Sequence, residues 1–150
     1  LSYRVRAELG YPFRFVELAQ EINASMPSYV FARTQDVLND LELSLKGSRI
    51  LLLGITYKEN VADRRESPAD PLAVLLISKG AEIAYADPYI SEWSVNGASV
   101  RRVFLGGRET FDLAILMQNH DDFEPTWVTS LAPAVLDTRG ALSGPGVAHI

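Results

Sequence analysis

Residues 49–88 read RILLLGITYKENVADRRESPADPLAVLLISKGAEIAYADP, and this stretch decides the fold. It opens at 49–55 with a continuous apolar run of strand length, as expected when helices cover both faces of a parallel strand. After a polar stretch, Pro68 precedes an apolar helix that ends at the turn residue Gly80. A second strand is predicted at 82–86. Strand, helix and strand within about 40 residues form a right-handed βαβ unit.

Apolar runs downstream extend this sheet. They indicate strands at 113–117 and 134–136 and favour another at 100–105. The predicted fold class is therefore α/β, a small doubly wound, Rossmann-like parallel sheet. Ligands bind such sheets beyond the carboxyl ends of the strands. That rule selects four polar loops, at 56–67, 87–89, 118–122 and 137–140.

A helical segment precedes the sheet. Apolar residues at i, i+3, i+4 and i+7 spacing predict a helix with one apolar face, and these residues are Phe15, Leu18, Ala19 and Ile22. Pro27 is expected to interrupt this helix, with a second one running from about Ser28 to Gly47. The predicted organisation is a helical region at 1–46 and an α/β domain at 47–150.

Composition excludes several classes of function. The chain of 150 residues is 47% hydrophobic, and its 14 basic and 19 acidic residues give a net charge of -5. That charge disfavours binding to nucleic acid or an anionic membrane, and no apolar run approaches the about 20 residues of a membrane span. Without cysteine, the chain has no disulfide, thiolate metal site or cysteine nucleophile. Since it starts at Leu1 without a signal peptide, we expect a piece of a longer, cytoplasmic protein.

The loop after the first strand is the most informative segment. It holds one glycine, Gly54, so neither the dinucleotide fingerprint nor the phosphate loop is present. Phosphate contacts would come from Lys58, Arg64 or Arg65 and from free amides at the start of the next helix. A solvated loop with internal ion pairs is the alternative, and charge composition leaves both open.

This loop resembles a known signature. GITYKENVADRRESPADP at 54–71 is similar to the carboxyl-terminal UDP-binding domain of nucleotide-sugar 6-dehydrogenases, the UDP-glucose/GDP-mannose dehydrogenase family. FVELAQEIN at 15–23 with Met26-Pro27 resembles the end of the central helical region of that family. Three further stretches of this chain resemble the second strand and the later loops of the family: GAEIAYADP at 80–88, NHDDF at 119–123 and DTR at 137–139.

The resemblance implies a function for the whole protein. Such enzymes oxidise the C6 alcohol of a UDP-sugar to the uronic acid in two hydride transfers to NAD, and they serve polysaccharide biosynthesis. An amino-terminal domain, missing here, binds NAD; the central helices form a homodimer and carry the reactive cysteine. The present chain would bind the nucleotide, lack the cysteine and be inactive alone. UDP-glucose, UDP-N-acetylhexosamine and GDP-mannose all remain open as substrates.

The resemblance also implies roles for four residues. Tyr57 would lie against the uracil ring and Lys58 against the diphosphate. Arg139 would contact the substrate, and Arg65 would reach NAD held by the other domain. Core packing is the alternative for Tyr57, and an ion pair with Asp137 is the alternative for Arg139. No catalytic residue and no metal ligand is expected in this chain.

Five neighbouring residues are interpreted structurally. Arg64 is expected to be solvated, Ser67 to cap the following helix, and Glu66 to hold an arginine. Asp87 is expected to form a turn rather than to bind a ribose, and His120 to form hydrogen bonds within its loop rather than to bind a metal.

Two non-enzymatic alternatives stand beside the enzyme fragment. A phosphoacceptor receiver domain shares the fold, but it needs an acidic cluster after the first strand, and residues 54–58 hold none. The other alternative is a non-catalytic dimerising or nucleotide-binding α/β module.

Overall fold

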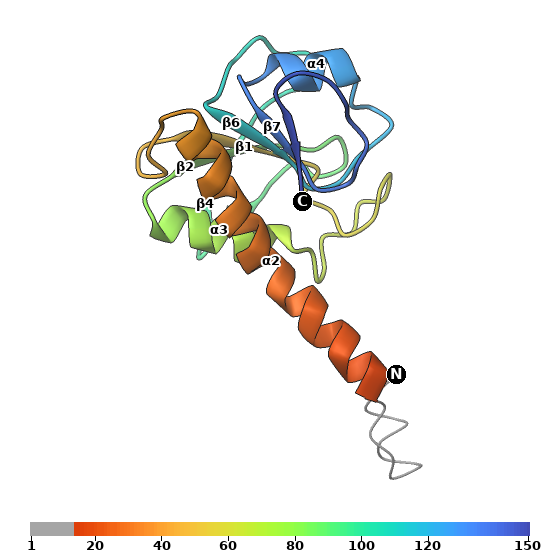
Figure 1. Ribbon diagram of the computed structural model, residues 1–150. Coiled ribbons are helices and arrows are strands. Elements are labelled where there is room, and N and C mark those ends of the chain that lie inside the picture. Colours follow the sequence, from red (N-terminus) through yellow and green to blue (C-terminus); the bar gives the residue numbers. More distant parts are fainter. Residues whose placement is uncertain (1–13) are drawn as a thin grey trace.

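A computed structural model describes residues 14–150 and shows a six-stranded sheet with helices on both faces (Figure 1). The strands are β1 (Arg49–Leu53), β2 (Glu82–Ala86), β5 (Arg101–Arg102), β6 (Leu113–Leu116), β7 (Val135–Asp137) and β8 (Val147–His149). Their order is β5-β2-β1-β6-β7-β8, and every neighbouring pair is parallel. The chain winds outward from β1 in both directions, which confirms the predicted doubly wound α/β fold.

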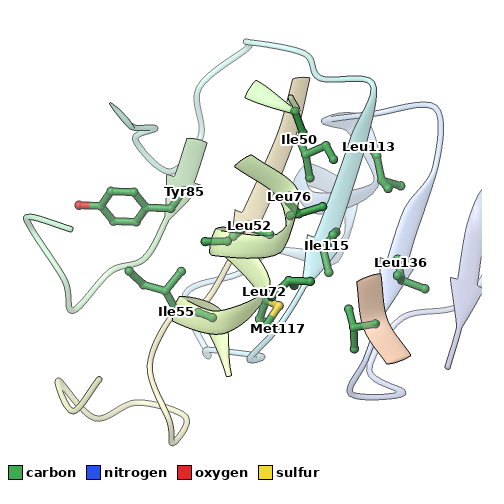
Figure 2. Packing of buried hydrophobic residues seen from close by; sticks show 14 of the residues in the cluster. Ile50, Leu52, Ile55, Leu72, Leu76, Tyr85, Leu113, Ile115, Met117 and Leu136 are labelled. Carbon is green, nitrogen blue, oxygen red and sulfur yellow. The ribbon is translucent and has the colours of Figure 1, made fainter. Parts of the chain in front are cut away.

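Each face of the sheet is buried by its own helices. Helices α2 (Arg14–Asp40) and α3 (Ala69–Ser78) cover one face, and α4 (Pro125–Ser130) covers the other. Alternate residues of β1 therefore enter different cores, Ile50 with α3 and Leu51 with α4. This arrangement explains why β1 is apolar at consecutive positions. Figure 2 shows the α3 side, where the labelled residues are Ile50, Leu52, Ile55, Leu72, Leu76, Tyr85, Leu113, Ile115, Met117 and Leu136.

The prediction of two helices separated at Pro27 is wrong. Helix α2 is continuous from Arg14 to Asp40 with Pro27 inside it. Proline removes only one backbone donor, and the helix beyond it is held against the sheet by buried Val30, Val37 and Leu38. The amino-terminal half instead projects away from the sheet (Figure 1). Residues 1–13 of the predicted helical region lie outside the described residues.

Helix α2 also ends earlier than the predicted Gly47. The Leu43 amide donates to Leu38 O at 2.8 Å and the Glu42 amide to Asn39 O at 2.9 Å. Glu42 adopts a φ of 58°, so these bonds form a Schellman motif with a non-glycine residue in the left-handed position. Leu43 packs against the core where the prediction had the helix continue to Gly47.

The remaining predicted elements agree with the structure within a few residues. Helix α3 and strands β1, β2, β6 and β7 are confirmed, whereas the strand expected at 100–105 shrinks to β5. The hairpin of β3 (Ser94–Val95) and β4 (Ala98–Ser99), the edge strand β8 and helix α4 were missed because such short elements show little periodicity. Among the described helices, none combines the length and apolarity that crossing a bilayer requires.

Candidate functional site

A cleft of about 1380 Å³ lies at the carboxyl edge of the sheet. Three of the four predicted loops contribute to its walls: 56–67 after β1, 118–122 after β6 and 137–140 after β7. Residues 87–89 after β2 do not line it. The middle of helix α2 supplies a further wall through Gln20, Asn23, Ala24, Met26, Pro27 and Val30. The cleft therefore lies at the edge that the ligand rule for doubly wound sheets selects.

Gly54 allows the chain to leave β1 at this edge. Its φ is +71°, and a Cβ at this position would lie 2.2 Å from the carbonyl oxygen of Gln118. Any other side chain would collide with the backbone at the end of β6. The close approach brings the loop of Tyr57 against Gln118, whose Nε2 donates to Tyr57 O at 3.3 Å.

The Tyr57 ring lies in the cleft wall and is half exposed. Its relative exposure is 51%, so the core-packing alternative is wrong. The Tyr57 amide donates to Asp63 O at 2.8 Å, which fixes the backbone while the ring stays free to contact a ligand. An exposed aromatic face in a cleft suits stacking against a planar group.

Among the described residues, Lys58 and Arg139 are the cations that line the cleft, and both are exposed. Within residues 14–150, neither side chain forms an ion pair. Asp137 instead accepts the backbone amides of Arg139 at 2.7 Å and Gly140 at 3.0 Å, so the alternative of an Arg139–Asp137 ion pair is wrong. Two unpaired cations at one cleft can both bind an anionic ligand.

The neighbouring arginines are paired. Arg64 contacts both carboxylate oxygens of Asp70, at 2.5 and 2.6 Å, and the Trp93 indole donates to the same carboxylate at 2.7 Å. The Arg64 side chain is 31% exposed, so the expectation of a solvated residue is wrong. Asp70, in the first turn of α3, thereby binds both Arg64 and Trp93, the residue that precedes the β3 hairpin.

Arg65 lies outside the cleft lining, with 88% of its side chain exposed. It forms two hydrogen bonds of 2.9 Å to the Asp63 carboxylate. The Arg65 guanidinium, helped by its backbone amide, lowers the pKa of Asp63 to about 2. The carboxylate thereby orients the arginine at the surface beside the cleft.

The start of α3 offers few free amides to an anion. Pro68, which has no amide hydrogen, is the N-cap residue of α3, so the prediction that Ser67 caps the helix is wrong in position. The Ser67 hydroxyl lies one residue earlier and accepts the Ala69 amide at 3.2 Å. Glu66 lines the cleft with a φ of 60°, while the nearby arginines are held by Asp63 and Asp70 instead. An anion in the cleft therefore depends on the cationic side chains.

A buried carboxylate organises the edge beneath the cleft. Asp87 accepts the amides of Tyr89 and Ile90 at 2.8 and 3.1 Å, which confirms the predicted turn. Its other oxygen accepts the Ile55 amide at 2.8 Å and faces His120 Nε2 at 3.3 Å. Burial raises the pKa of Asp87, but the hydrogen bonds from His120 and these amides together lower it below its ordinary value.

Sequence reasoning missed the wall formed by helix α2 and the role of Gln118. The wall had no local signal, because it arises when α2 packs across the sheet. Gln118 lies in one of the four predicted ligand loops, but no sequence pattern predicted a role for it. Its side chain is buried, and its Oε1 has no hydrogen-bond partner within the described residues. In the same part of the chain, no group of three or more His, Cys, Asp or Glu residues could hold a metal ion.

The fold and the cleft define a Rossmann-like ligand-binding domain suited to an aromatic, anionic ligand. The chain belongs to the UDP-glucose/GDP-mannose dehydrogenase family, whose UDP binding domain matches residues 51–144.

Known relatives agree with this assignment. The UDP-N-acetyl-D-mannosamine dehydrogenase of Methanococcus maripaludis strain S2 is 31% identical over 112 residues, 74% of this chain and 25% of that protein. The UDP-N-acetyl-D-glucosamine 6-dehydrogenase of Pseudomonas aeruginosa is 24% identical over 117 residues, 77% of this chain and 28% of that protein. The solved structure of a UDP-D-ManNAc dehydrogenase from Pyrococcus horikoshii has the same fold, with a TM-score of 0.76 at 18% identity over 97% of this chain and 35% of the other. The chain thus spans about a quarter to a third of these relatives.

Proposed function

We propose that this chain is the nucleotide-binding part of an NAD-dependent UDP-sugar 6-dehydrogenase. The observation that carries the proposal is the cleft in which half-exposed Tyr57 lies beside Lys58 and Arg139, two cations that form no ion pair within residues 14–150. An aromatic face and two cations match a pyrimidine base joined to a diphosphate. Family membership supports this assignment.

Each residue has a distinct proposed role. Tyr57 stacks on the uracil ring, Lys58 binds the diphosphate, and Arg139 contacts the phosphate or sugar end of the substrate. The cleft of about 1380 Å³ exceeds the about 300–1,000 Å³ of common small-molecule sites, so it has room for a nucleotide-sugar. The names of the relatives support a UDP-linked N-acetylhexosamine as the sugar.

The remaining parts of the reaction are assigned to missing segments. The single Gly54 after β1 does not make a dinucleotide fingerprint, so NAD, which accepts the hydrides, is proposed to bind an amino-terminal domain. Arg65, held outward by Asp63, would reach that NAD. The chain has no cysteine, so the thiol needed for the second oxidation lies elsewhere and this piece is inactive alone. A cytoplasmic location and a role in polysaccharide biosynthesis complete the proposal.

Helix α2 is proposed to form a homodimer as the end of the central helical region. Its amino-terminal half carries Phe15, Leu18 and Ile22 on one face, exposed by 80%, 54% and 53%. Large apolar side chains at i, i+3 and i+7 are suited to a helix of a second copy. We place the division between this region and the UDP-binding domain near residues 46 and 47.

Calorimetric titration of the chain with UDP, GDP and NAD tests the proposal. We expect UDP to bind in preference to the other two, and Lys58→Ala to weaken UDP binding about tenfold because a charge-assisted contact is lost. Lys79→Ala removes the same charge at an exposed position away from the cleft and is the matched control. Unchanged UDP affinity in Lys58→Ala would show that this lysine does not bind the diphosphate.

A further inference from the structure

His120 is completely buried beneath the loop that carries Tyr57 and Lys58. Its Nδ1 accepts the backbone amide of Asn60 at 2.9 Å. On the other side of the ring, Nε2 lies 3.2 Å from the Thr56 hydroxyl oxygen and 3.3 Å from Asp87 Oδ2. One imidazole therefore contacts the loop after β1 and the end of β2.

The partners determine which nitrogen carries the hydrogen. A backbone amide only donates, so Nδ1 must be unprotonated to accept from Asn60. The Asp87 carboxylate only accepts, and the Thr56 hydroxyl already donates to Lys58 O at 2.8 Å. The hydrogen therefore lies on Nε2, and both ring nitrogens form hydrogen bonds in this neutral tautomer.

The loop is fastened at one more point by Asn60 itself. Its backbone has a φ of 57°, a left-handed conformation that asparagine tolerates better than most residues. Its Oδ1 accepts the Asp121 amide at 3.0 Å. Two hydrogen bonds thus connect residues 56–60 to the loop after β6: the Asn60 amide donates to the His120 side chain, and the Asp121 amide donates to the Asn60 side chain.

We propose that His120 is a positioning residue for nucleotide binding, which holds Tyr57 and Lys58 in place through the Asn60 amide. This inference rests on the proposed function, in which those two side chains bind UDP. Both side chains are exposed, so the backbone of residues 56–60 sets where they point. A loop that is ordered before binding loses less conformational entropy when the ligand arrives.

Two substitutions separate the contacts of the ring. The amide oxygen of His120→Asn falls near the position of Nδ1 and can accept from Asn60, but it does not reach Asp87. The amide of His120→Gln falls near Nε2 and can donate to Asp87, but it leaves the Asn60 amide without its acceptor. Both variants lose the ring and its contacts with Tyr89 and Phe123. Weaker UDP binding in His120→Gln than in His120→Asn therefore reports the Asn60 contact, whereas the opposite order would report the Asp87 contact and overturn the proposed role.

Calorimetric titration with UDP is the main measurement. We expect His120→Gln to bind UDP about tenfold more weakly than the unmodified chain, and His120→Asn to stay within about threefold of it. Hydrogen exchange of the Asn60 amide, followed by NMR without ligand, should be faster in His120→Gln than in His120→Asn. Urea unfolding of each variant identifies any that is not folded.

The outcomes distinguish the two proposals. If the unmodified chain binds no UDP, the proposed function is overturned. If it binds UDP and His120→Gln binds equally well, the positioning role alone is overturned. Equal weakening in the two variants, with equal Asn60 exchange, also overturns that role, because the ring would then act only as packing.

Discussion

Replacing Gly54 by alanine tests the physical basis of the cleft edge. The added Cβ would lie 2.2 Å from Gln118 O and 2.9 Å from its carbonyl carbon, and these are backbone atoms that no side-chain rotation can move. The φ of +71° adds about 1 kcal/mol of left-handed strain. Forcing apart well-packed atoms costs typically about 1–3 kcal/mol more. We therefore expect Gly54→Ala to lower the free energy of unfolding by about 3 kcal/mol.

Gly140→Ala is the matched control. Its φ of +67° is almost the same, but no atom lies within 4 Å of the added Cβ, so only the strain of about 1 kcal/mol should remain. Urea unfolding followed by fluorescence of buried Trp93 measures both free energies. A difference of less than about 1 kcal/mol between the variants would refute the argument that the approach of Gly54 to Gln118 requires glycine. The same variants should be titrated with UDP, because separation of β1 from β6 displaces Tyr57.

Three further predictions concern other parts of the molecule. The pKa of Asp87 is lowered in the folded state, so the stabilisation from its carboxylate is present above about pH 4 and is lost as the pH falls through the folded pKa. Between about pH 6 and pH 3, Asp87→Asn should therefore lose less free energy of unfolding than the unmodified chain. Equal losses of the two proteins in urea unfolding would contradict this prediction. Asp70→Asn should lower the free energy of unfolding by about 1 kcal/mol and change the fluorescence emission of Trp93, because both Arg64 and the Trp93 indole lose a charged partner. An unchanged emission spectrum would argue against the contact between Trp93 and Asp70. Leu18→Glu should convert a dimer to a monomer in light scattering, and a monomeric unmodified chain would refute the proposed interface.

The sheet was predictable because its signals are local. The run from Ile50 to Leu53 is apolar on both faces, and the helix between Pro68 and Gly80 is bounded by residues that act within one turn. The parallel topology then follows from chain connectivity and handedness. Pro27 shows the limit of such reasoning: its local effect predicted a break, but packing of the following turns against the sheet keeps α2 continuous.

For the candidate site, too, local features were predictable from the sequence and contacts between distant residues were not. The sequence by itself determined the family, the fold class and the loop that carries Tyr57 and Lys58, because motif order and strand periodicity are written along the chain. The tertiary structure alone decided that α2 forms a wall of the cleft and that, within the part of the chain that the structure describes, Arg64 is paired while Arg139 is not. It also decided that His120 meets the Asn60 amide. These contacts join residues far apart in the sequence, and they depend on distances that only the packed sheet and helices establish.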